Sequence, residues 1–126
     1  MAYKSLMKEL TDNFSDPDDE IPMTVLANLP YLNAVVYESL RLGTPLPGLP
    51  RVVPKSGLVV EGSFIPAGTI VGVSPYVQEI SPKNFYPQPE AYKPERWLPG
   101  GLGSGTITKK TAIMSFSFGK IFMDLA

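Results

Sequence analysis

Glu38 and Arg41 are the first residues in the sequence whose types and spacing could do chemistry. They lie three positions apart in LPYLNAVVYESLRL, and side chains with that spacing share one face of a helix. On a protein surface, such an ion pair is worth only about 0.2–0.5 kcal/mol. A second arginine, Arg96, follows far downstream in PERW. Because a guanidinium is planar with several donors, one carboxylate and two arginines can form a single buried network, provided that a scaffold surrounds it.

Arg51 is the second candidate, because it is the only charged residue between Leu42 and Pro54. Two interpretations are open. Arg51 is either an outward-facing residue of a short strand or a cation held for an anionic group of a ligand. Ser115 and Ser117 have no base nearby in the sequence, so we do not assign a nucleophile.

The absence of Cys and His excludes much chemistry. The 126 residues contain neither type, so they cannot form a disulfide, a Cys or Ser-His nucleophile, or a zinc site with Cys or His ligands. We therefore predict no catalytic residue and no metal ligand. A net charge of −1 argues against binding of nucleic acid. No apolar run approaches the ~18–20 residues of a membrane helix, so we expect no membrane segment in this chain.

Two helices are predicted in the first third of the chain. Apolar residues at helical spacing indicate a helix over residues 1–14 and a second helix over residues 30–42, which begins at Pro30 and ends before Gly43. On the second helix, the apolar stripe is predicted to contain Leu29, Leu32, Val35, Val36, Ser39 and Leu40. Residues 15–24 are acidic and contain prolines, which is typical of a solvated loop.

Short strands and turns are predicted in the rest of the chain. Residues 49–74 contain a hairpin around Glu61-Gly62 and a further strand over 69–73. Prolines and aromatic residues dominate residues 81–99, which we expect to form an irregular packed meander because Phe85, Tyr86, Tyr92 and Trp97 need burial. Residues 100–110 are predicted to be a glycine-rich loop. The fold class is α+β, with two helices, a small antiparallel sheet and the meander in one domain over residues 1–126.

The order of these motifs resembles the C-terminal part of a cytochrome P-450. The sequence contains ESLR, then Pro50-Arg51, FIPAGT, PERW and finally FSFG. Five such elements in this order are far more specific than E-x-x-R alone. The longer phrases LPYLNAVVYESLRL and FYPQPEAYKPERWL are similar to fungal members of the family. The chain is thus identified as an incomplete C-terminal part of one P-450 domain.

The resemblance implies a role for several residues. Glu38 and Arg41 would be the E-x-x-R pair, and Arg96 would complete a structural triad with them. Arg51 would lie against a propionate of heme b, the cofactor of the family. Phe116 and Gly119 would open the heme-binding loop, which we place over residues 116–126 and expect to be truncated.

The sequence departs from the family pattern after Gly119. The Arg and the Cys of F-x-x-G-x-R-x-C-x-G are missing, and that Cys is the axial ligand of the heme iron. The resemblance implies a heme-dependent monooxygenase that oxidises a small apolar molecule with dioxygen and takes electrons from a reductase. We expect this truncated form to be inactive alone. The alternatives are a non-catalytic interaction module and an unstable fragment left by an incorrect gene model.

Overall fold

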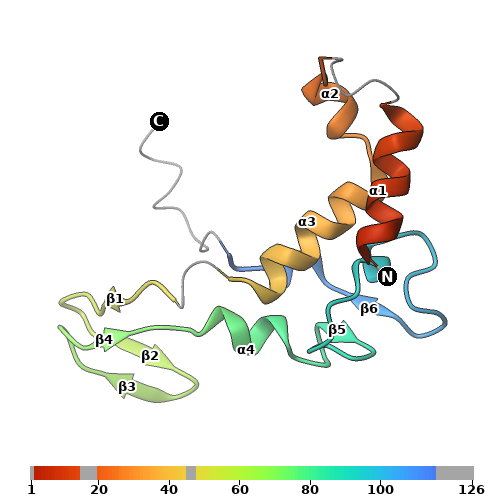
Figure 1. Cartoon of the computed structure of the whole chain (residues 1–126). Helices are drawn as coiled ribbons and strands as arrows, with labels where there is room; N and C mark the ends of the chain where they lie inside the picture. The colour runs from red at the N-terminus through yellow and green to blue at the C-terminus, as the bar shows by residue number, and fades with distance from the viewer. Residues whose placement is uncertain (1, 15–19, 45–47, 116–126) are drawn as a thin grey trace.

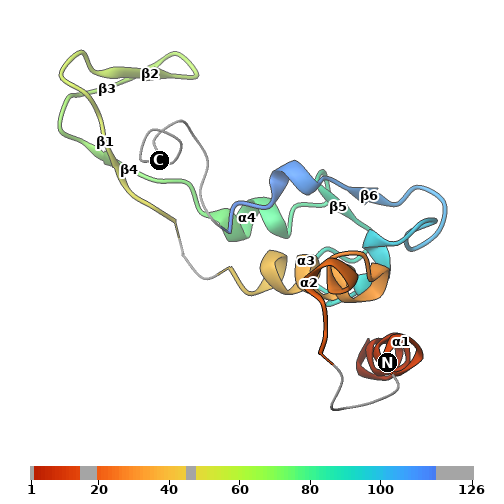
Figure 2. The same ribbon diagram turned by 90° about the horizontal axis from the view of Figure 1, so that it is seen from above.

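The computed structural model of the chain describes residues 2–14, 20–44 and 48–115. Over these residues the protein is elongated. Helices lie at one end and a group of short strands lies at the other, with α4 (Pro75–Glu79) between them (Figures 1 and 2). The arrangement is mixed α and β, as the sequence predicts. None of the helices described is long and apolar enough to cross a membrane.

Helices occupy the predicted positions and two others. The helices and 3-10 turns are α1 (Ala2–Asn13), α2 (Met23–Leu26), α3 (Pro30–Leu42), α4, η1 (Pro94–Trp97) and η2 (Lys110–Ala112). Four of them, the helices α2 and α4 and the 3-10 turns η1 and η2, were not predicted, because three to five residues are too few to show a helical period. Part of the predicted loop over residues 15–24 is therefore helical. Helix α3 packs against α1, α4 and η1, so it is the central element of the helical part.

Helix α3 buries a different face from the predicted one. Its buried residues are Tyr31, Ala34, Glu38 and Arg41. Of the predicted apolar stripe, Leu29 at the N-cap is buried, Val36 and Ser39 are exposed, and the other members, Leu32, Val35 and Leu40, are half-buried. The spacing of the buried residues is helical, so the period was predicted correctly and the orientation was wrong. The physical reason is that Glu38 and Arg41 find hydrogen-bond partners in the meander, which allows their charged face to turn inward.

The strands form three separate antiparallel pairs rather than one small sheet. The pairs are β1 (Arg51–Val52) with β4 (Ile70–Val71), β2 (Leu58–Val60) with β3 (Ser63–Ile65), and β5 (Phe85–Tyr86) with β6 (Ile107–Thr108). Prolines between and beside these strands cannot donate to a ladder and keep each pair short. The predicted hairpin is present, with Glu61 at φ 48° and Gly62 at φ 81° between Val60 and Ser63. Two positive φ values in a two-residue loop match the twist of a hairpin.

The meander is only partly buried. Phe85 has no exposed surface, but Tyr86 and Tyr92 are 50% and 45% exposed, so the expectation of burial was wrong for both tyrosines. Trp97 is half-buried, and its ring lies 5.2 Å from that of Tyr37. The 3-10 turn η1 brings the last residues of the meander against α3.

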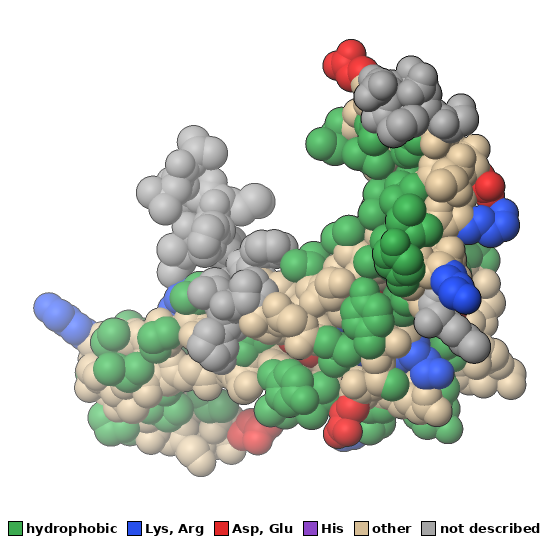
Figure 3. All heavy atoms as spheres, in the orientation of Figure 1, with side chains coloured by type: hydrophobic (Ala, Val, Ile, Leu, Met, Phe, Trp, Pro, Cys, Tyr) green, Lys and Arg blue, Asp and Glu red, His purple; other side chains and the backbone are tan. Residues whose placement is uncertain are grey.

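Much apolar surface faces solvent. Tyr3 and Met23 are 74% and 76% exposed, and Phe64 and Ile70 of the strand group are 66% and 71% exposed. In the space-filling view, hydrophobic side chains run along the upright column of α1 and α2 and gather again over the strands (Figure 3). The interior, in contrast, contains several charged side chains, among them Glu38, Arg41, Glu79 and Arg96.

Candidate functional site

The carboxylate of Glu38 is the centre of a buried hydrogen-bond network. Arg41 donates to it twice, from Nε to Oε2 at 2.9 Å and from Nη2 to Oε1 at 2.7 Å. Arg96 Nε donates to Oε1 at 3.0 Å, and the backbone N–H of Lys93 donates to the same oxygen at 2.8 Å. Trp97 Nε1 donates to Oε2 at 2.9 Å. The acid and both arginines have fully buried side chains.

The remaining donors of the two arginines bind backbone carbonyls at the end of α4 and in the meander. Arg41 Nη1 donates to the carbonyls of Glu79, at 2.6 Å, and Pro89, and Nη2 donates to that of Ala91 at 3.2 Å. Arg96 donates to the carbonyls of Pro87 at 3.2 Å and Gln88 at 2.9 Å. Every buried side-chain nitrogen and oxygen in the described part of the chain has a partner. The two guanidinium groups therefore fix the path of the meander over residues 87–91.

The charges of this network favour the ionised form of Glu38. Burial by itself opposes ionisation and raises the pKa of Glu38. The hydrogen bonds from Arg41, Lys93 and Trp97, together with the charge of Arg41, outweigh burial and hold the pKa below its usual value. The carboxylate is thus an anion between two cations. It has no lone pair available for proton transfer, so the network can hold a fold together but is not an acid-base centre.

A second carboxylate, Glu9, binds the start of α3. Its Oε1 accepts the N–H of Tyr31 and its Oε2 accepts the N–H of Leu32, each at 2.7 Å. These N–H groups belong to the first turn of the helix, where no carbonyl of the helix itself can accept from them. Because Leu29 at the N-cap provides no side-chain hydrogen bond, Glu9 of α1 replaces the usual local cap.

Tyr31 connects the same helix to η1. Its hydroxyl donates to Oε1 of Glu95 at 2.8 Å. Burial and the hydrogen bond to Glu95 raise the pKa of Tyr31 above its usual value, because both favour the neutral phenol beside an acid. The contact places a neighbour of Arg96 against α3, beside the network around Glu38.

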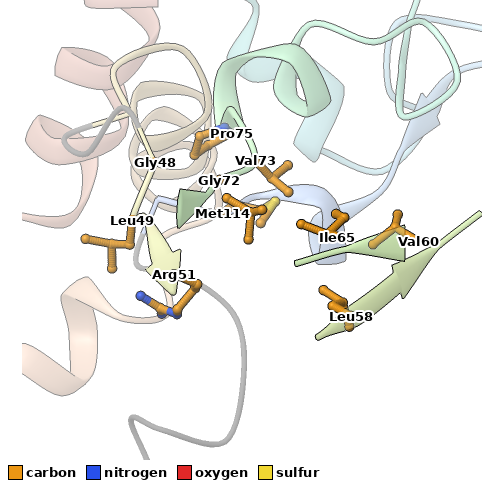
Figure 4. A pocket seen from close by; sticks show the side chains of 11 residues that line it. Gly48, Leu49, Arg51, Leu58, Val60, Ile65, Gly72, Val73, Pro75 and Met114 are labelled. Carbon is orange, nitrogen blue, oxygen red and sulfur yellow. The ribbon is translucent and has the colours of Figure 1, made fainter. Parts of the chain in front are cut away.

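Arg51 lies in a different part of the molecule, where it is an exposed residue of strand β1, as the first interpretation expects, and also lines an apolar cavity of about 510 Å³. Figure 4 shows Arg51 and Leu49 on the side of β1, and Leu58, Val60 and Ile65 on the β2–β3 hairpin. The other lining residues include Val71, Val73, Pro75 and Met114. Among the described residues that line the cavity, Arg51 is the charged one. The arrangement suits an apolar molecule that carries an anionic group.

The structure therefore brings Glu38, Arg41 and Arg96 together and places Arg51 at a separate cavity. Phe116 and Gly119 lie outside the described residues, as does the predicted heme loop over 116–126. Among the described residues, no group of three or more His, Cys, Asp or Glu side chains could hold a metal ion. Sequence reasoning missed the role of Trp97 and of Glu9. Trp97 directly follows Arg96, which was a usable signal, whereas nothing in the sequence around Glu9 points to residue 31.

Comparison with known proteins gives the class of this fold and site. The sequence profile of the Cytochrome P450 family matches residues 2–121. The chain is 43% identical over 119 residues to the cytochrome P450 monooxygenase aneG of Aspergillus aculeatus, which covers 94% of this chain and 22% of that protein. It is 40% identical over 119 residues to the cytochrome P450 monooxygenase ORF11 of Penicillium roqueforti, which covers 94% of this chain and 24% of that protein.

A solved structure supports the same family assignment. Retinoic acid-bound cyanobacterial CYP120A1 superposes with a TM-score of 0.72 at 26% identity, over 94% of this chain and 26% of that one. The chain belongs to the cytochrome P450 family. Both curated relatives are fungal, as the resemblance indicated, and the chain spans about a quarter or less of their length.

Membership of the family implies that heme is the cofactor. The residues of this chain suit the ring and carboxylates of heme but not its iron. An apolar cavity with one arginine fits an apolar ring with a carboxylate at its edge. The iron of the family is held by a Cys thiolate, and the 126 residues include neither Cys nor His. These residues do not provide the axial ligand, so no reaction step is assigned to them.

Proposed function

We propose that this chain is an incomplete C-terminal part of a heme-dependent monooxygenase that oxidises a small apolar organic molecule with dioxygen. In this proposal residues 1–126 form one wall of the heme site, and the electrons come from a separate reductase. The chain alone does not catalyse the reaction. Family membership and the coverage of about a quarter or less of each relative's length support the proposal.

The observation on which the proposal depends most is the position of Arg51. Its side chain lines an otherwise apolar cavity, where a guanidinium can form a charge-assisted hydrogen bond with a carboxylate such as a propionate of heme. We further propose that Phe116 and Gly119 lie at the heme, by resemblance to the family motif. Glu38, Arg41 and Arg96 serve as the structural triad that holds the meander against α3.

A hemin titration of the whole chain tests this assignment. Arg51→Ala is expected to weaken hemin binding about tenfold, the effect of losing about 1.4 kcal/mol from a charge-assisted hydrogen bond. Lys55→Ala is a suitable control, because it removes an exposed cation from a nearby turn that does not line the cavity. Equal affinity of Arg51→Ala and the unchanged chain would remove Arg51 from the proposal.

The predicted inactivity has its own measurement. Reduced hemin-loaded protein under carbon monoxide is expected to lack the absorption typical of a thiolate-ligated iron, because no residue of the chain supplies a thiolate. No substrate oxidation is expected with dioxygen and a reductase. A thiolate-type spectrum or heme-dependent oxidation by this chain would contradict the proposal.

A further inference from the structure

Glu79 has a fully buried carboxylate, which is not one of the ion-paired groups around Glu38. It is the last residue of α4 and has no exposed surface. Its Oε1 accepts the backbone N–H of Met114 at 3.0 Å, and its Oε2 accepts the hydroxyl of Thr44. A buried carboxylate is costly unless its oxygens are hydrogen-bonded, and here each oxygen has one partner.

These bonds join three segments that are far apart in the sequence. Thr44 lies just beyond the C-terminal end of α3, Glu79 ends α4, and Met114 follows η2. The backbone carbonyl of Glu79 also accepts from Arg41 Nη1 at 2.6 Å. One residue therefore links the arginine of the buried network to the chain that leads to residue 116.

Ser115 strengthens the same junction. It is 1% exposed, and its hydroxyl donates to the carbonyl of Leu40 on α3 at 2.8 Å. Met114 and Ser115 are thus held by two independent bonds, one from the Met114 N–H to Glu79 and one from the Ser115 hydroxyl to α3. They are also the last described residues before Phe116.

Both donors to the Glu79 side chain are neutral. Within the described part of the chain, no Lys or Arg nitrogen forms an ion pair with this carboxylate, whereas Glu38 has two such pairs. Glu79 therefore acts through the direction of its hydrogen bonds rather than through attraction between charges. A glutamine has the same shape. Its carbonyl oxygen can accept from Met114, and its amide can donate to the oxygen of Thr44.

We propose that Glu79 is a positioning residue, which fixes Met114 and Ser115 against the C-terminal end of α3. It thereby sets the point from which the chain continues into residues 116–119. The inference rests on the proposed function in one respect, since the importance of that point depends on Phe116 and Gly119 lying at the heme. The clamp itself, defined here as Thr44, Glu79 and Met114, needs no cofactor to be tested.

Amide hydrogen exchange of the whole chain, followed by NMR, measures the clamp locally. In Glu79→Ala, the amide of Met114 loses its acceptor and is expected to exchange about tenfold faster, while amides in the middle of α3 keep their protection. In Glu79→Gln, exchange at Met114 is expected to stay within about threefold of the unchanged chain. Glu90→Ala removes an exposed glutamate and is the matched control, with no change expected at Met114.

Thr44→Val tests the second bond of the clamp in a milder way. It removes one donor and leaves the Met114 N–H bonded, so we expect a smaller increase in exchange than in Glu79→Ala. This variant and Glu79→Gln keep the proposal falsifiable even if Glu79→Ala fails to fold. Unchanged exchange at Met114 in Glu79→Ala would overturn the proposal. If that variant does not fold, unchanged exchange at Met114 in Thr44→Val would overturn it.

Two other results would also overturn it. If Glu79→Gln exchanged as fast as Glu79→Ala, the charge and not the hydrogen-bond geometry would matter. If Glu79→Ala accelerated exchange equally throughout α3, the residue would have only a general role in stability. Absence of hemin binding by the unchanged chain would instead contradict the assignment of Arg51, Phe116 and Gly119 to the heme, and the exchange rates would still test the clamp.

Discussion

Arg96 Nε lies 3.0 Å from Oε1 of Glu38, across 58 positions of sequence, and both side chains are fully buried. Each of these residues also holds other groups, since Glu38 accepts from Arg41 and Arg96 donates to the carbonyls of Pro87 and Gln88. The meander and α3 therefore share one polar interior. Removing either end of this contact leaves a buried charge with fewer partners.

We predict strongly non-additive effects for Glu38→Ala and Arg96→Ala. Each single variant is expected to lose about 3–5 kcal/mol of unfolding free energy, because it leaves an uncompensated buried charge. The double variant is expected to lose little more than either single one. Urea unfolding followed by circular dichroism gives all four values of the cycle.

The exposed pair of Lys8 and Asp12 is the control for this cycle. These side chains lie 2.6 Å apart and are 76% and 58% exposed, so their two alanine variants should be additive and nearly neutral. Additive losses for Glu38 and Arg96 as well would mean that the buried network does not form in solution.

Acid should weaken the fold through Glu38. Its folded-state pKa lies below that of the unfolded chain, so the carboxylate contributes stability above the unfolded value of about 4.3, and this contribution is lost as pH falls through the folded pKa. We predict that Glu38→Gln is much less stable than the unchanged chain at pH 7. The gap should narrow on going to pH 3. Urea midpoints across this range measure the gap, and a constant gap would contradict the assignment.

Glu9 should contribute to stability as a distant helix cap. Glu9→Ala removes the acceptors of the Tyr31 and Leu32 N–H groups, and we expect a loss of about 0.5–2 kcal/mol, as for other N-caps. Asp12→Ala, on the exposed part of the same helix, is the matched control and should be nearly neutral. Faster amide exchange confined to Tyr31 and Leu32 in Glu9→Ala would locate the effect. Equal stability of the two variants would show that the cap is not used.

The phenol of Tyr31 should ionise at a higher pH than an ordinary tyrosine. Burial and the bond to Glu95 raise its pKa above 10.0. The unfolded chain therefore ionises first, and stability is lost as pH rises from about 10 through the folded pKa. In an ultraviolet titration, Tyr31→Phe should remove a phenolate component that ionises above pH 10. Glu95→Gln should shift that component toward lower pH, and an unshifted curve in Glu95→Gln would contradict the role of Glu95.

Local sequence signals predicted local structure well. Pro30 and Gly43 set the limits of α3, and Glu61-Gly62 set the register of the hairpin, because these residues act through their own backbone preferences. The short helix α4 gave no usable signal, since its five residues complete little more than one turn.

One long-range contact, that of Glu38 and Arg41 with Arg96, was suggested by the donors of the two arginines and made specific by the family resemblance. Spacing predicted that Glu38 and Arg41 share a helix face, but no periodicity connects them to Arg96. The same limit explains why the apolar stripe of α3 was placed on the wrong face, and why the cap from Glu9 and the clamp at Glu79 were missed. Each of these features depends on the position of a backbone segment that is distant in the sequence, and a single sequence does not give that position.

Among the described residues, the largest fully buried side chains are Arg41, Phe85, Glu38, Glu79, Pro94 and Ser115, and four of these six are polar. An apolar core tolerates many substitutions of similar volume. A buried hydrogen-bond network tolerates fewer, because each donor and acceptor must keep its distance and angle. Random replacement by aliphatic residues should therefore be tolerated far better on the outside of this chain than at its centre. The fold of this protein therefore depends less on the amount of buried surface than on the correct pairing of its buried donors and acceptors.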